Sequence, residues 1–142
     1  MSEKLFRFIA MLSLSFTACG QEPKKISNQT KEEHQMDYSK LTNTTVKSAV
    51  EALQNGDKKA WYNHFTSNAV FTDDGKTLDL KSFFDNAFYH QEKFLTFDKV
   101  ENNGTAITGS FFAGQWGTFK VFFKFTVNQE GKITKLDIGQ AK

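Results

Sequence analysis

The chain has 142 residues, of which 39% are hydrophobic and 15% aromatic, and 16 of them are phenylalanine. This length suits one domain that buries a core without disulfide bonds or structural metals. Lysine and arginine total 18 against 16 acidic residues, and Arg7 is the only arginine, so the composition excludes the concentrated basic face and the arginine forks that nucleic-acid binding uses.

The N-terminal segment has the order of a secretory signal that ends in a lipidated cysteine. Basic residues precede an uncharged run over 8–16, and Ala18 stands directly before Cys19, the only cysteine. This order resembles the lipobox of bacterial lipoproteins. The resemblance implies that residues 1–18 are a signal peptide and that a lipid on Cys19 anchors the protein in the bacterial cell envelope, facing the periplasm or the cell surface. The alternative is an ordinary secretory signal that is cut after Ala18.

A polar segment follows the cysteine. Residues 19–40 carry too few apolar side chains to offset the entropy cost of ordering them. We therefore predict a flexible tether over 19–40 and a folded domain over 41–142.

Three helices are predicted in the first half of this domain. Apolar residues recur at three- and four-residue spacing over 46–53, and Gly56 ends that helix. Asp57 is expected to cap a second, short helix. Asp79 is expected to cap a third helix over 80–88, which has the broadest apolar face in the chain.

The second half of the domain changes to the period of two that is typical of strands. A short strand over 70–72 precedes the third helix, and four longer strands are predicted over 94–101, 105–112, 118–127 and 132–138. Three helices followed by a meander of strands indicate an α+β domain, with the helices packed on one face of a curved, mostly antiparallel sheet.

The strand over 118–127 has two different faces. One face carries only Phe and Val, including Phe123 and Phe125, and is expected to be covered by the helices. The other face carries Lys, Thr and Phe122, which suits a partly solvated surface or the contact of a homodimer.

Three motifs in this order carry a family resemblance. They are Ala-Leu-Gln-Asn-Gly-Asp over 52–57, the stretch from Phe65 to Asp73, and Val-Asn-Gln-Glu-Gly-Lys-Ile over 127–133. Together they resemble the nuclear transport factor 2-like superfamily over residues 43–140. The resemblance implies a cone-shaped fold with a cavity between the concave face of the sheet and the helices, and it implies frequent dimers.

The superfamily includes ketosteroid isomerases, polyketide cyclases, scytalone dehydratase and members without a reaction, so the fold alone does not assign a function. The position that matches the catalytic base of the isomerases is Asp73. The positions of their two oxyanion donors match Ala49 and Phe123, whose side chains donate no hydrogen bond. Because losing one such donor costs a factor of about 10²–10³, we expect no steroid-isomerase chemistry.

The expected cavity nevertheless has several candidate side chains. Asp73 is either a general base at the cavity mouth or a turn aspartate that is hydrogen-bonded to the backbone. The candidates for ligand binding are mostly aromatic: Tyr62, Tyr89, His90, Trp116, Phe123 and Phe125. Trp116 would either cover a ligand or plug the cone. We expect no metal site, since the three histidines are scattered, and no cofactor, since no glycine loop of the phosphate-binding type occurs.

These observations favour a membrane-anchored lipoprotein whose non-catalytic domain binds a small apolar ligand, or a protein partner, in or around an aromatic cavity. One alternative is a cyclase-, dehydratase- or isomerase-like enzyme that uses Asp73 as its general base. A second alternative is a structural homodimer of the cell envelope.

Overall fold

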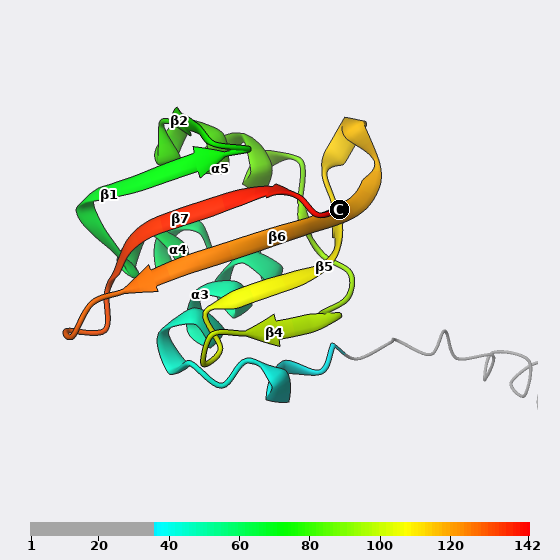
Figure 1. Ribbon diagram of the computed structural model, residues 1–142. Coiled ribbons are helices and arrows are strands. Elements are labelled where there is room, and N and C mark those ends of the chain that lie inside the picture. Colours follow the sequence, from blue (N-terminus) through cyan, green and yellow to red (C-terminus); the bar gives the residue numbers. More distant parts are fainter. Residues whose placement is uncertain (1–35) are drawn as a thin grey trace, which may run out of the picture. The chain divides into compact units, whose positions relative to one another are not determined.

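The helices of the domain lie on one face of a curved, open sheet (Figure 1). The structure is a computed structural model, and it describes residues 36–142. The predicted signal peptide over 1–18, Cys19 and the tether as far as residue 35 lie outside the described residues. Within residues 36–142 the predicted α+β arrangement of three helices on a mostly antiparallel sheet is confirmed.

Each of the three helices begins at a side chain that caps it. Their bounds are Thr44–Gln54 for α3, Lys58–Asn63 for α4 and Leu80–Tyr89 for α5. Asp57 accepts a hydrogen bond from the backbone N–H of Ala60, and Asp79 accepts one from that of Ser82. Both caps were predicted from the sequence, because a short acceptor side chain at this position satisfies a free N–H of the first turn.

The sheet has seven strands. They are β1 Phe65–Asp73, β2 Lys76–Leu78, β3 Lys93–Phe94, β4 Lys99–Glu101, β5 Ala106–Phe112, β6 Thr118–Val127 and β7 Ile133–Gln140. Their order is β2-β1-β7-β6-β5-β3, and β4 also pairs with β5. β1 and β7 are parallel, and the other pairs are antiparallel. Single 3-10 turns cover Tyr38–Lys40 and Gly114–Trp116.

The structure corrects two of the predicted strands. The strand predicted over 70–72 begins at Phe65, and it forms a hairpin with β2, a strand that was not predicted. Asp74 and Gly75 join the two strands with φ angles of 48° and 82°, the positive pair that a two-residue hairpin turn requires.

The strand predicted over 94–101 is broken into β3 and β4. At the break, the backbone of Thr96 lies so close to Gly109 that a Cβ on this glycine would overlap the Thr96 carbonyl group. The break is compatible only with a residue that lacks a side chain at position 109.

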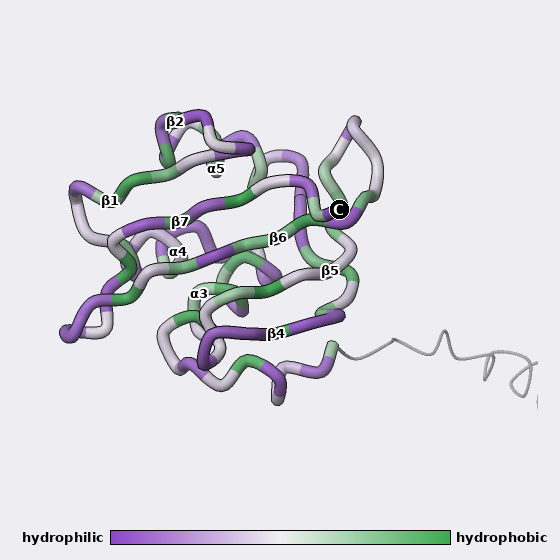
Figure 2. Tube along the Cα trace, in the orientation of Figure 1, coloured by the Kyte–Doolittle hydropathy of each residue, from purple (hydrophilic) through white to green (hydrophobic). Residues whose placement is uncertain are grey.

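The apolar face of β6 forms the centre of the core. Phe123 and Phe125 are buried beneath the helices, and the Phe123 ring packs edge-on against the ring of Phe94 at 4.8 Å between centroids. Figure 2 shows hydrophilic residues interrupting the hydrophobic ones along this strand. Phe119 belongs to the same face but is 36% exposed, so the helices do not cover the first part of β6. Phe122 lies on the opposite face, where the Lys124 ammonium group is 5.0 Å from its ring centroid.

Packed structure begins before the predicted domain boundary at residue 41. Met36 and Tyr38 are partly buried against the core, and the Tyr38 ring lies 5.5 Å from that of Phe97. In residues 36–142, none of the helices has both the length and the apolar character that crossing a membrane needs.

Candidate functional site

A cavity of about 290 Å³ opens where the helices leave β6 uncovered. It lies between the end of β1, the end of β7, the start of β6 and the segment that follows α5. Its apolar wall consists of the following side chains: Phe83, Phe111, Phe119, Val121, Phe123 and Ile138. Trp116 stands at its rim with 75% of its surface exposed. The cavity is therefore mainly aromatic inside and open to solvent at one end.

Three carboxylates line the same cavity, on Asp73, Asp74 and Glu92. Asp74 is engaged, since its Oδ1 accepts a 3.1 Å hydrogen bond from the backbone N–H of Gln140. The side chains of Asp73 and Glu92 make no hydrogen bond or ion pair with any residue in 36–142. The cavity thus holds two carboxylates without a protein partner in the described part of the chain.

Burial affects the protonation of both groups. Asp73 is half-buried, and this burial, together with the neighbouring charge of Asp74, raises the pKa of the Asp73 carboxyl. Glu92 is only 9% exposed, and burial raises its pKa, although the charge of His90 opposes the shift. Removal from water disfavours the charged form of a carboxyl group, which explains both directions.

The turn that ends α5 places Glu92 in the cavity. The Gln91 N–H donates to the Phe88 carbonyl at 3.1 Å, and the Glu92 N–H donates to the Ala87 carbonyl at 2.9 Å. With a φ of 56° at Gln91, this is a Schellman turn. Such turns usually have glycine at the left-handed position, and here it is glutamine, so no local sequence signal marks the turn or places Glu92 in the cavity.

Of the predicted site residues, Asp73, Trp116 and Phe123 line the cavity. Trp116 stands at the rim and does not plug the cone. Phe125 was also predicted to bind the ligand, but it is buried in the core and does not line this cavity. The face of β6 continues past the cavity toward Trp61, whose ring centroid is 6.4 Å from that of Phe125.

Tyr89 and His90 do not line the cavity either. Tyr89 is 83% exposed. His90 Nδ1 is 2.9 Å from the Asn86 carbonyl oxygen, one turn back along α5. Tyr89 is the last residue of α5 and His90 follows it, and neither side chain forms a hydrogen bond with Asp73.

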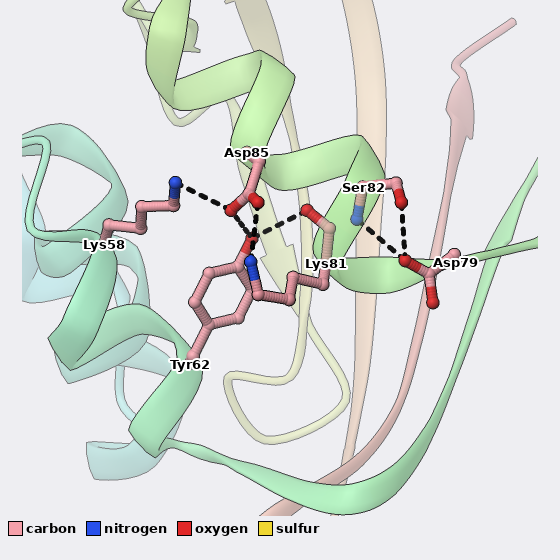
Figure 3. A network of polar contacts seen from close by, with 6 residues as sticks. All are labelled: Lys58, Tyr62, Asp79, Lys81, Ser82 and Asp85. Atoms are coloured by element: carbon pink, nitrogen blue, oxygen red, sulfur yellow. Dashed lines mark hydrogen bonds and ion pairs between the residues drawn. The ribbon is translucent and has the colours of Figure 1, made fainter.

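Tyr62 belongs to a polar network between α4 and α5 (Figure 3). Its hydroxyl is 2.8 Å from Asp85 Oδ1, and the ammonium groups of Lys58 and Lys81 lie 2.8 and 2.7 Å from the same carboxylate. Hydrogen bonds from Lys58, Lys81 and Tyr62, in this order, hold the pKa of Asp85 well below its usual range. Burial and then the bond to Asp85 raise the pKa of Tyr62. Tyr62, which was predicted to bind the ligand, does not line the cavity, and its hydroxyl is held between the two helices.

The two positions that match the oxyanion donors of the isomerases are apolar and buried. Ala49 is fully buried in α3, and Phe123 forms part of the cavity wall. Tyr62, Tyr89 and His90 form no hydrogen bond with Asp73. Among residues 36–142 there is also no group of three or more His, Cys, Asp or Glu side chains placed to hold a metal ion.

No protein-family model and no curated protein matches the sequence. Solved structures do match it. A nuclear transport factor 2-like protein of unknown function from Cytophaga hutchinsonii is 14% identical with a TM-score of 0.58, and the match covers 70% of this chain and 89% of that one. A putative polyketide cyclase from Sinorhizobium meliloti is 17% identical with a TM-score of 0.55, covering 66% of this chain and 92% of the cyclase.

A third similar structure is the epoxide hydrolase/cyclase-like enzyme of pyran ring formation in the polyether salinomycin. It is 16% identical with a TM-score of 0.53, and the match covers 68% of this chain and 88% of the enzyme. At these identities the comparison concerns the arrangement of helices and strands and not the site. The domain has the nuclear transport factor 2-like fold, as the resemblance in the sequence implies.

Proposed function

We propose that this protein is a membrane-anchored bacterial lipoprotein whose domain binds a small, largely apolar ligand without transforming it. The observation that carries the proposal is the aromatic cavity, whose volume is about 290 Å³. Ligand pockets usually have volumes of about 300–1,000 Å³, so this cavity is close to the lower end of that range. A lipid on Cys19 would hold the domain at the membrane.

The rim of the cavity supports a binding role. Trp116 is 75% exposed and Phe119 is 36% exposed, and both line the opening. A ligand that covers these rings removes apolar surface from water, at about 25 cal/mol per Å². Phe83, Phe111 and Phe123 would contact the part of the ligand that enters more deeply.

The test compares two variants, each of which replaces one valine by the larger phenylalanine. Val121 lines the cavity and Val70 is 45% exposed on β1, outside it. Small aromatic compounds should bind to the unaltered protein and to Val70→Phe, as measured by calorimetry, and the Val121→Phe variant should bind them at least tenfold more weakly because the new ring occupies the cavity. Equal binding by the two variants would contradict the proposal, and so would the absence of binding to the unaltered protein.

The second candidate function is a cyclase-, dehydratase- or isomerase-like enzyme with Asp73 as general base. It is supported by the raised pKa of this half-buried carboxyl, which faces the cavity, and by the cyclase-like enzymes among the structures of similar fold. The apolar side chains of Ala49 and Phe123 disfavour it, since they offer no donor for a developing oxyanion.

Proton exchange separates this candidate from the binding role. If Asp73 is a base, the unaltered protein in D₂O should accelerate exchange of the acidic C–H protons of a bound aromatic ketone such as 2-tetralone, and Asp73→Asn should not. Binding without exchange would favour the non-catalytic role.

A further inference from the structure

All charged residues that line the cavity are acidic: Asp73, Asp74 and Glu92. Three lysines form ion pairs outside the cavity. Lys58 and Lys81 bind Asp85 between the helices, and Lys120 pairs with Asp98. No basic side chain of residues 36–142 lines the cavity. The charged lining of the cavity is therefore acidic, although the charge of His90, which does not line it, also acts on Glu92.

Glu92 is the least exposed of these carboxylates. It is 9% exposed, and in residues 36–142 its side chain makes no hydrogen bond and no ion pair, although the charge of His90 acts on it. A buried polar group normally has a partner, because an unpaired one costs the full price of its desolvation. The carboxylate oxygens of Glu92 are not fully enclosed, and a ligand with a donor would give them the partner that residues 36–142 do not supply.

The aromatic rings beside these carboxylates suit the same kind of ligand. Trp116 and Phe119 are exposed at the opening, while Phe111 and Phe123 lie in the wall. The faces of aromatic rings attract cations, and tryptophan does so most strongly. An anion would meet two unpaired carboxylates, and a neutral apolar molecule would leave both without a donor.

Building on the proposed function, we infer that the ligand is a small organic cation. Its ammonium group would pair with the carboxylate of Asp73 or of Glu92, and its apolar body would contact the aromatic wall. Hydrogen bonds between charged partners are about twice as strong as neutral ones, so the charge of the ligand should dominate its selection.

Two probes of nearly the same size and shape test this inference. They are 2-phenylethylammonium, which carries the charge and N–H donors, and 2-phenylethanol, which carries one neutral donor. With the unaltered protein at neutral pH, calorimetry should give a Kd for the ammonium compound that is about tenfold or more below that for the alcohol. This comparison does not depend on any variant folding correctly.

Variants then locate the origin of the preference. In Asp73→Asn combined with Glu92→Gln, which keeps the side-chain shapes but removes both charges, the two probes should bind within about twofold of each other. The control is Glu130→Gln, which removes an exposed carboxylate in the turn between β6 and β7 and should keep the full preference.

The outcomes distinguish the inference from the proposed function. If the alcohol binds as tightly as the ammonium compound to the unaltered protein, the inferred ligand class is wrong while the binding role stands. A preference that survives in the double variant would also overturn the assignment to Asp73 and Glu92. If neither probe binds, the proposed function fails together with the inference.

Discussion

The backbone N–H of Gln140 donates a 3.1 Å hydrogen bond to Asp74 Oδ1, and the Asp74 N–H donates a 2.9 Å bond to the Ile138 carbonyl oxygen. These two bonds join the hairpin after β1 to the end of β7 at the rim of the cavity. They engage the Asp74 carboxylate and fix the end of the strand that carries Asp73. Of the three acidic side chains that line the cavity, Asp73 and Glu92 are the two that accept no hydrogen bond from residues 36–142.

Gly139→Ala tests the close packing at this junction. A Cβ at position 139 would overlap Asp74 Oδ1 and would lie 2.7 Å from the Phe122 ring, so both the Asp74 side chain and the ring must move. We expect a loss of about 1–3 kcal/mol in the free energy of unfolding, as for other overpacked sites, measured by urea denaturation. Gln140→Ala is the control and should be nearly neutral, because Asp74 is bound by the backbone of residue 140 and not by its side chain. A fully stable Gly139→Ala protein would contradict the packing described here.

Tyr62→Phe should weaken the fold and leave the cavity intact. The substitution removes the hydroxyl that bonds to Asp85 between α4 and α5 (Figure 3), and a hydrogen bond of this kind is worth about 1 kcal/mol. Thermal unfolding should shift to lower temperature, while the affinity for the aromatic probes should stay within about twofold. A strong loss of binding at unchanged stability would restore the ligand role that was predicted for Tyr62.

The two unpartnered carboxyl groups predict a particular pH dependence. The pKa values of Asp73 and Glu92 are raised in the folded state above their ordinary values of 3.8 and 4.5. The folded protein therefore holds these protons more tightly than the unfolded chain. Their stabilising contribution is complete below the ordinary values and is lost as the pH rises through the raised ones.

The double variant Asp73→Asn, Glu92→Gln should thus be more stable than the unaltered protein at pH 7, and this gain should disappear as the pH falls below about 3.8. Urea denaturation of both proteins across this range measures the difference. Asp85 has a lowered pKa and loses its stabilising effect in strong acid, but it is present in both proteins and cancels. A double variant that is less stable at pH 7 would show that these carboxylates have stabilising partners.

The proposed anchor depends on Cys19, which lies outside the described residues. If a lipid on this cysteine holds the protein at the membrane, Cys19→Ala should move it from the membrane fraction to the soluble fraction of the cell. Detection by immunoblot is sufficient, and Ser27→Ala, a change in the predicted tether, is the matched control. A Cys19→Ala protein that fractionates with the membrane as the unaltered one does would exclude the anchor.

Local sequence signals were enough for much of the fold. The apolar stripes and the caps Asp57 and Asp79 predicted the helices, and the period of two over Thr118–Val127 predicted β6. These features depend on neighbours along the chain. The break between β3 and β4 depends instead on the contact of Thr96 with Gly109, which no local pattern indicates.

The site was less predictable for the same reason. Asp73 could be placed near the cavity because it follows the strand predicted over 70–72 and matches the catalytic base of the isomerases, and Trp116 was expected to cover or plug the cone. Glu92 follows a Schellman turn with no glycine to mark it. Tyr62 finds its partner 23 residues further along the chain, at Asp85, and this contact exists only once α4 and α5 have packed together.

The two tryptophans allow the most direct test of the cavity as the ligand site. Trp116 lines its rim, whereas Trp61 is fully buried in the core and does not line it. Titration of the ¹⁵N-labelled protein with 2-phenylethylammonium should shift the indole N–H signal of Trp116 progressively and leave that of Trp61 in place. A Trp116 signal that does not move at saturating probe, or equal movement of both signals, would contradict binding in this cavity.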